Sequence, residues 1–148
     1  MHMATEEIPD LIGRAQRYAA AAFAFCERFP FPSSGRHAAN QFYEASSSAT
    51  TNYCAAKRGR STAEFISKLG TVVEEIDEAV RWLEHMRNIG IAVDSDLFSE
   101  AEQLRRIWGA SLGTARRNER ARQQRLKDAR AKQRNQKHAK PRRDRDPT

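Results

Sequence analysis

Apolar residues recur every three or four positions in four stretches of the chain, a period typical of amphipathic α-helices. The pattern predicts helices over about 9–28, 37–57 and 62–89, and a fourth helix that begins after residue 95. The sequence contains no strand-like alternation, no hairpin dipeptide and no long-period repeat. Four amphipathic helices with short connections predict an all-α fold, an antiparallel up-down four-helix bundle.

The four predicted core faces differ in the size of their side chains. The most regular stripe belongs to 62–89 and consists of Phe65, Leu69, Val72, Ile76, Ala79, Leu83 and Met86. The stretch 37–57 offers mostly small residues, which let a neighbouring helix approach closely: Ala38, Phe42, Ala45, Ala49, Tyr53 and Ala56. The fourth helix is expected to bury Leu97, Ala101, Leu104, Trp108, Leu112 and Ala115. The first is expected to bury Ile8, Leu11, Ile12, Ala15, Ala19, Ala22, Phe23, Cys26 and Phe29.

The predicted helix ends carry their own signals. Pro30 ends the first helix, because proline restricts the residue before it and cannot continue the helix itself. Ser61 and Glu64 have the spacing of a capping box at the start of the third helix. Gly59, just before this box, is expected to take a positive φ, and Gly90 is expected to follow the end of the third helix.

Charge is distributed unevenly along the chain. Of its 26 Lys and Arg and 19 Asp and Glu, residues 1–113 hold 12 and 15, whereas residues 114–148 hold 14 and 4, a net charge of +10. Leu126 is the only large apolar residue of this last stretch, so the stretch cannot bury a core face. We therefore predict two regions: a bundle over 1–115, and a basic tail over 116–148 that either continues the fourth helix or is disordered.

Known catalytic and metal-binding motifs are missing from the sequence. GxSxG, P-loop, HExxH and zinc spacings do not occur, and no histidine has a glutamate three positions before it, as the di-iron sites of helix bundles require. Cys26 and Cys54 form no CxxC motif and are interpreted as reduced thiols. No membrane span or convincing signal-peptide cleavage site is present. These observations predict a non-enzymatic cytoplasmic protein with no metal, no cofactor and no catalytic residue.

An ordered set of short motifs runs through residues 46–84. It comprises Asn52-Tyr53, Arg58-Gly59-Arg60-Ser61, Ala63-Glu64-Phe65-Ile66, Lys68-Leu69, Glu74-Glu75, Asp77-Glu78 and Trp82-Leu83-Glu84. In this set the chain resembles the four helix bundle protein family, first noticed as proteins encoded within intervening sequences of bacterial 23S rRNA genes. The resemblance extends over about residues 8–115. It departs from the common family pattern at Ala55-Ala56 and Thr71-Val72, and the basic tail lies outside it.

The resemblance implies more than a fold. Relatives assemble as homopentameric rings or barrels, and a related group, the accessory variability determinants of diversity-generating retroelements, partners a reverse transcriptase and binds nucleic acid. Matching the family also implies a buried polar contact between Asn52 and Glu78 that sets helix register; two solvated side chains are the alternative. Four aromatic residues that exceed the needs of a small bundle also favour a homo-oligomer, expected to be a pentamer: Tyr43, Trp82, Phe98 and Trp108.

The function predicted from these observations is nucleic-acid binding, to RNA in particular, and the resemblance adds a partner enzyme such as a reverse transcriptase. The predicted contacts are the basic residues of the corner between the second and third helices and those of the tail: Lys57, Arg58, Arg60, Arg116, Arg117, Arg120, Arg122, Arg125, Lys127 and Arg130. For each single arginine, ordinary solvation is the alternative. For the whole protein, the alternative is a protein-interaction scaffold ring that binds no nucleic acid.

Overall fold

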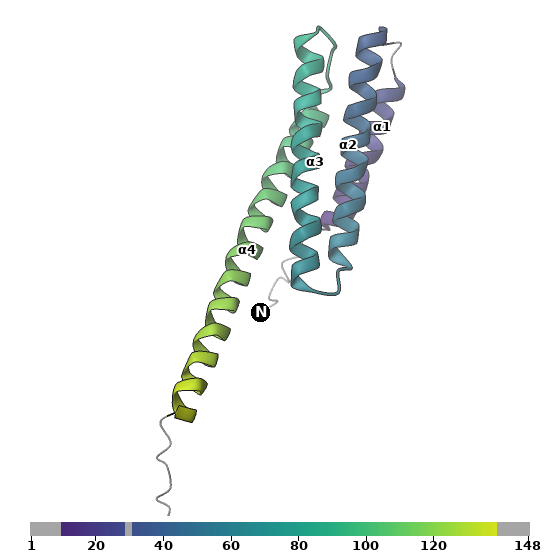
Figure 1. The fold of residues 1–148 in the computed structure, drawn as a ribbon. Helices are drawn as coiled ribbons and strands as arrows, with labels where there is room; N and C mark the ends of the chain where they lie inside the picture. Colours follow the sequence, from purple (N-terminus) through teal and green to yellow (C-terminus); the bar gives the residue numbers. More distant parts are fainter. Residues whose placement is uncertain (1–9, 29–30, 139–148) are drawn as a thin grey trace, which may run out of the picture. The chain divides into compact units, whose positions relative to one another are not determined.

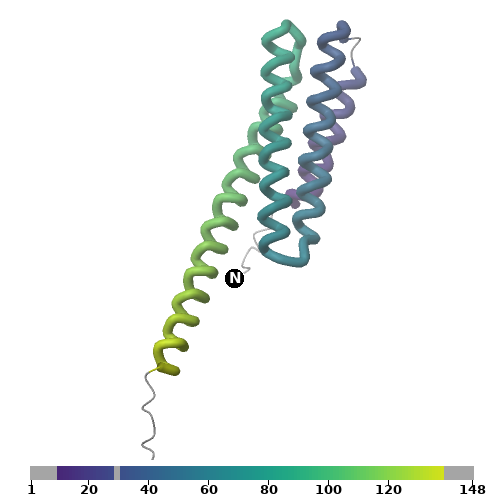
Figure 2. Tube along the Cα trace, in the orientation of Figure 1, coloured from purple at the N-terminus to yellow at the C-terminus, as the bar shows by residue number. Residues whose placement is uncertain are grey.

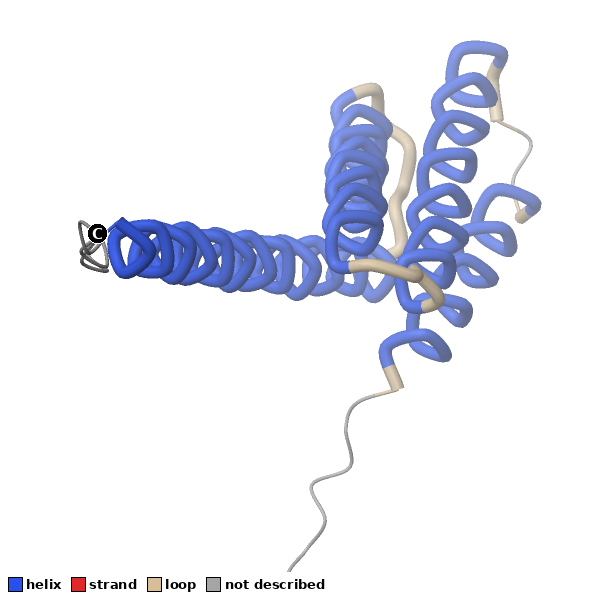
Figure 3. Tube along the Cα trace, turned by 60° about the horizontal axis from the view of Figure 1, so that its bottom comes forward, coloured by secondary structure: helices blue, strands red, loops and turns tan. Residues whose placement is uncertain are grey.

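The computed structural model of the protein describes residues 10–28 and 31–138, and within them the regular structure is entirely helical (Figure 3). The helices are α1 (Leu11–Glu27), α2 (Ser33–Lys57), α3 (Thr62–Asn88) and α4 (Ser95–His138), so the four predicted helices are confirmed (Figure 1). Successive helices pack on one another, and the chain reverses direction between each helix and the next (Figure 2).

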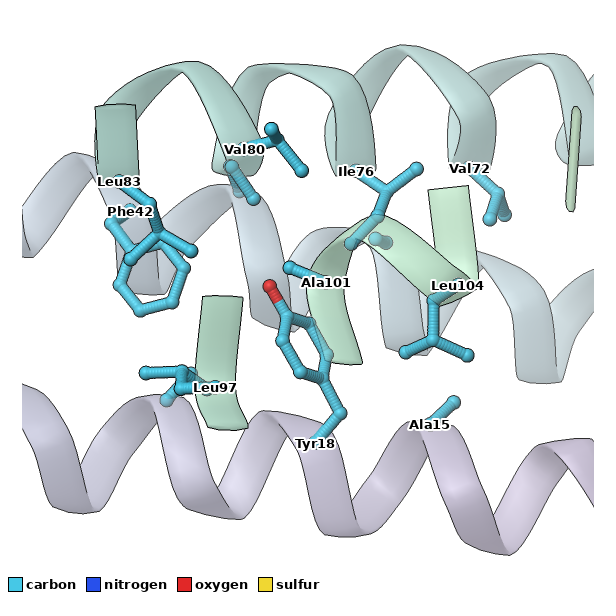
Figure 4. Packing of buried hydrophobic residues seen from close by; sticks show 14 of the residues in the cluster. Ala15, Tyr18, Phe42, Val72, Ile76, Val80, Leu83, Leu97, Ala101 and Leu104 are labelled. Atoms are coloured by element: carbon cyan, nitrogen blue, oxygen red, sulfur yellow. The ribbon is translucent and has the colours of Figure 1, made fainter. Parts of the chain in front are cut away.

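Most of the predicted core faces are confirmed. All six residues predicted for α2 are buried, as are those of α3 except Phe65, which is half-buried. In α4 the buried residues are Leu97, Ala101, Leu104, Trp108 and Leu112, whereas Ala115, also predicted, is only half-buried. Figure 4 shows how Ile76 and Val80 of α3, Leu104 of α4 and Ala15 of α1 face a common interior. Because every helix contributes to one core, burying apolar surface stabilises the packing of all four.

The predicted face of α1 is partly wrong. The structure buries Tyr18 and Phe25, whereas Phe23 is 50% exposed and Ala19 only half-buried. Phe25 packs edge-on against Phe42 of α2, with ring centroids 6.1 Å apart. Between residues 18 and 26 every side chain of α1 is apolar or aromatic, so spacing alone does not select one face. Ile8 and Phe29, also predicted for this face, lie outside the described residues.

Charged side chains join the first part of α4 to its neighbours. Arg14 of α1 donates to Glu100 of α4 at 2.6 Å and to Gln103 at 2.8 Å. On α3, Asp77 accepts from Arg105 of α4 at 3.2 Å and also pairs with Arg81 at 2.7 Å. The pairs of Arg14 with Glu100 and of Arg105 with Asp77 lie at the partly exposed edges of the core, where they contribute less than burial does but favour one alignment of the helices. The pair of Asp77 with Arg81 lies within α3.

The capping box at the start of α3 is confirmed, except that the Glu64 carboxylate accepts from the residue before Ser61 instead of from Ser61 itself. Ser61 Oγ accepts from the Glu64 backbone N–H at 3.1 Å, and the Glu64 carboxylate accepts from the backbone N–H of Arg60, at 3.0 Å. The predicted positive φ of Gly59 is wrong, because among the described glycines only Gly90 has one. A Cβ on Gly59 would instead lie 3.0 Å from the carbonyl oxygen of Ala56. Close backbone approach explains this glycine.

Gly90 ends α3 as predicted, in a Schellman motif. Its φ is 86°, and its N–H donates to the Arg87 carbonyl at 3.0 Å. The N–H of Ile91 reaches back to the carbonyl of Met86 at 2.9 Å. Both bonds satisfy carbonyl groups that the end of a helix leaves without partners.

The chain divides into two compact units between Gly113 and Thr114, two residues before the predicted boundary. The first unit contains α1, α2, α3 and the beginning of α4, and the second contains the rest of α4.

Candidate nucleic-acid interface

The predicted corner residues gather at the connection between α2 and α3. Lys57 is the last residue of α2, and Arg58 and Arg60 follow it; all three are exposed. A hollow of about 440 Å³ lies here, lined by Ala56, Lys57, Gly59, Arg60, Ser61, Thr62 and Phe65. Two of the three predicted cations therefore border one concave surface.

The electrostatics of this corner favour an anion. Among the described residues, the side chains of Lys57, Arg58 and Arg60 form no ion pair. The backbone N–H groups of Thr62 and Ala63, in the first turn of α3, have no acceptor within the described part of the chain. Because the N-terminus of a helix carries partial positive charge, this end of α3 adds to the attraction of the three side chains for a phosphate.

The second set of predicted residues lies on the helix that forms the described part of the second unit. Over 114–138 the chain holds ten Lys and Arg against two Asp and Glu. All seven predicted cations, from Arg116 to Arg130, are exposed. Lys132, Arg134 and Lys137 were not predicted but are equally exposed on the same helix. Their charge is visible in the sequence.

Few of these cations have a partner within 114–138. Arg122 pairs with Glu119 at 3.4 Å, and Arg117 donates to the hydroxyl of Thr114 at 3.1 Å. Asp128 accepts from Gln124 at 2.9 Å and forms no ion pair among the described residues. The remaining predicted cations form no hydrogen bond or ion pair within the described part: Arg116, Arg120, Arg125, Lys127 and Arg130. Their charge is available to a partner.

The structure gives Asn52 and Glu78 different partners from the contact predicted between them. Asn52 donates to the carbonyl of Ser48, one turn earlier on α2, at 3.0 Å. Glu78 is exposed and accepts from the indole N–H of Trp82 at 3.2 Å. Glu75 lies deeper, in a hollow of about 200 Å³ that it lines together with Ser48 and Glu78. Burial and the nearby Glu78 carboxylate raise the pKa of Glu75.

The four aromatic residues that favoured a homo-oligomer lie in different environments. Trp108 is fully buried, with its ring centroid 5.2 Å from that of Tyr53, so it contributes to the core and not to a surface. Phe98 is half-buried beneath the guanidinium of Arg87, at 3.8 Å. Trp82 is also half-buried, with its ring centroid 5.8 Å from that of His37 of α2. Tyr43 is 37% exposed and contacts the exposed Phe23 of α1, with ring centroids 5.6 Å apart. Phe23 and Tyr43 form the exposed aromatic pair of α1 and α2.

Comparison with known proteins bears on the fold. A crystal structure of a protein of unknown function from the S23 ribosomal protein family of Bacteroides thetaiotaomicron VPI-5482 superposes with a TM-score of 0.60. The match covers 69% of this chain and 97% of that one, at 16% sequence identity. The chain has the fold of that protein. At this identity the likeness establishes the fold alone, in agreement with the resemblance seen in residues 46–84.

No family model matches the sequence, and no curated protein matches it. Within residues 10–28 and 31–138, no group of three His, Cys, Asp or Glu side chains is placed to hold a metal ion. No helix in the described part of the chain has the length and apolarity needed to cross a membrane.

Proposed function

We propose that this protein is a non-enzymatic, cytoplasmic nucleic-acid-binding protein whose target is RNA. The observation that carries the proposal is the charge of the helix over 114–138. Ten exposed Lys and Arg side chains outnumber its two carboxylates, and most of them lack an ion-pair partner. Folding this segment into a core would require apolar side chains that it does not have. A dense, uncompensated positive charge on a helix is instead suited to a phosphate backbone.

The mechanism proposed is counterion release. Each cation that neutralises a phosphate displaces a condensed counterion, so affinity falls steeply as salt is added. The corner residues Lys57, Arg58 and Arg60, beside the N-terminus of α3, supply a second positive surface on the first unit. Such contacts position a nucleic acid without reading its sequence.

The proposed assembly is a homo-oligomer, a pentameric ring as the family resemblance implies, which acts beside a partner enzyme such as a reverse transcriptase. The exposed aromatic pair Phe23 and Tyr43 supports this assembly, since aromatic side chains are enriched at protein interfaces. Light scattering of the full chain at tens of micromolar tests this; a monomer of 16.9 kDa would contradict it.

The experiment that tests RNA binding is truncation after Arg117, which removes residues 118–148. We expect the melting temperature to stay nearly unchanged, because the described part of the removed segment contributes nothing to the buried core. RNA affinity should fall at least roughly tenfold, and the dependence of log K on log salt should flatten. If the truncated chain binds RNA with the same affinity and the same salt dependence, the tail is not the binding element.

The second candidate function is a scaffold that docks a partner protein without binding nucleic acid. The exposed aromatic pair favours it, because contiguous apolar surface on a small protein commonly marks a protein contact. Filter binding of RNA and DNA to the full chain at low salt separates the two functions. Binding supports the first function, and its absence for both polymers supports the second.

A further inference from the structure

Six cations of the second unit lie along one face of α4. Successive residues of an α-helix are rotated by about 100°, so positions separated alternately by four and three residues share a face. Positions 116, 120, 123, 127, 130, 134 and 137 follow that spacing throughout, and only Gln123 among them is uncharged. We call the six the cationic row: Arg116, Arg120, Lys127, Arg130, Arg134 and Lys137.

The cationic row is long, exposed and uncompensated. All six side chains are exposed, and none forms an ion pair with another described residue. At ~1.5 Å per residue, the row extends over about 32 Å of helix. Asp128 lies on another side of the helix, where it accepts from Gln124. Glu119, three residues after Arg116, borders the row and is already engaged by Arg122 and Gln123. The row thus presents six cations beside one carboxylate that already has partners.

The same segment lacks the groups that hold a single strand. Proteins that bind single-stranded RNA stack its bases on aromatic rings, a contribution that offsets the entropy lost when a flexible strand is ordered. Residues 114–138 contain no Phe, Tyr or Trp, and their single aromatic ring is that of His138, one residue beyond the cationic row. A duplex requires no such contribution, since its phosphates already lie at fixed positions and at higher charge density.

We propose that the cationic row binds the phosphate backbone of double-stranded RNA, independently of base sequence. This inference rests on the proposed function and specifies the form of the nucleic acid. Six phosphate contacts on a duplex correspond to a slope of log K against log salt of about −5, by analogy with the ~0.9 per contact of B-form DNA. Affinity should accordingly fall roughly a thousandfold between 50 and 200 mM salt.

The experiment compares two probes and two variants of the full chain. The probes are a 24-base-pair RNA duplex of mixed sequence and an unstructured single-stranded RNA of 24 nucleotides, both measured by fluorescence anisotropy across a salt series. The row variant combines Arg120→Gln, Lys127→Gln, Arg130→Gln and Arg134→Gln. The matched control also removes three arginines and one lysine, but from other faces of the helix: Arg117→Gln, Arg122→Gln, Arg125→Gln and Lys132→Gln. Glutamine keeps a comparable helix propensity, which circular dichroism verifies.

The expected result is that the duplex binds at least roughly tenfold tighter than the single strand. The row variant should lose duplex affinity roughly a hundredfold or more at 50 mM salt and flatten the slope by about 3 to 4. The control should lose several-fold less. Equal or tighter binding of the single strand, or equal losses for the two variants, would overturn the duplex inference and leave RNA binding standing. If the unmodified chain binds neither probe at low salt, the proposed function itself fails.

Discussion

A buried hydrogen bond between α1 and α2 offers a direct test of how the core is aligned. The hydroxyl of Tyr18 lies 2.9 Å from Oγ of Ser46, and both residues are almost fully buried, at 2% and 0% exposed. Figure 4 shows the Tyr18 ring among Leu97 and Ala101 of α4, with its oxygen directed away from α1. No second side-chain partner serves the Ser46 hydroxyl among the described residues. The change proposed is Tyr18→Phe, which removes the hydroxyl and leaves the ring in place.

The expected loss of stability depends on the buried Ser46 hydroxyl, which Tyr18→Phe leaves without its partner. A buried polar group that loses its partner costs about 1–3 kcal/mol, whereas removing both partners is nearly neutral. We therefore expect Tyr18→Phe to lower the free energy of unfolding by about 1–3 kcal/mol, a fall in melting temperature of roughly 4–8 °C per kcal/mol for a unit of this size. Ser46→Ala should cost slightly less, because alanine is the better helix former. The double variant should cost about 1–2 kcal/mol less than the sum of the two single variants.

The assay is urea denaturation at pH 7, followed by far-ultraviolet circular dichroism, for all four members of this double-mutant cycle. Tyr43→Phe is the matched control: it removes the same hydroxyl from a ring that is 37% exposed, and it should change stability by less than about 0.5 kcal/mol. Single-variant costs that add to within ~0.4 kcal/mol would refute the reasoning, because they would mean that the two hydroxyls do not interact.

The same tyrosine predicts an alkaline dependence of stability. Burial raises the pKa of Tyr18 above its ordinary value, despite the hydrogen bond with Ser46, which lowers it. The unfolded chain releases this proton first, near pH ~10, so the contribution of Tyr18 is complete below that pH and is lost as the pH rises further. Stability of the unmodified protein should therefore decline more steeply above pH ~10 than that of Tyr18→Phe. Parallel declines in urea series from pH 8 to 11 would contradict this assignment.

Two further predictions concern backbone conformation and thiol chemistry. Gly90→Ala should destabilise the protein by roughly 1 kcal/mol because φ is 86°, whereas Gly109→Ala, within α4 and with open space around its Cβ position, should stabilise it by up to roughly 1 kcal/mol; urea midpoints of the same sign for both would contradict the assigned φ. Cys54, half-exposed, should react with a thiol reagent at pH 8 well before Cys26, since Cys26 is buried and its pKa is raised to about 11; mass spectrometry of partly labelled protein checks the order, and preferential labelling of Cys26 would contradict it.

Local signals predicted the helices and most of their ends. The stripe of α3 and the small residues of α2 repeat at helical spacing over many turns, so their buried faces were predicted almost completely. The capping box of Ser61 and Glu64 and the end at Gly90 depend on neighbouring residues only, and both were predicted correctly. The break at Gly59 was predicted correctly, but for the wrong reason. A glycine is needed there because the Ala56 carbonyl lies close to where a Cβ would be, and the sequence pattern does not reveal that distance.

The cations of the candidate interface could be predicted from the sequence, whereas the contact between Asn52 and Glu78 could not. The excess of Lys and Arg over 114–148 is a property of composition, so the tail cations follow from the sequence directly. The contact expected between Asn52 and Glu78 depended on the rotation of α3 against α2. The actual rotation exposes Glu78 and half-buries Glu75 beside Ser48. Residues three positions apart on a helix differ by about 60° around its axis, enough to exchange an interior edge for solvent.

The sequence by itself determined that this protein has four helices, that three of them have well-defined core faces, and that its positive charge lies in the last quarter of the chain. Those properties follow from side-chain periodicity and composition, which act along the chain. Only the tertiary structure decided which side of the nearly all-apolar α1 is buried. Tyr18 lies inside because Ser46 of α2 satisfies its hydroxyl, and Phe23 lies outside because Phe25 occupies the position facing Phe42. Burial of a polar atom depends on a partner from another helix, and that partner is fixed only when the helices pack.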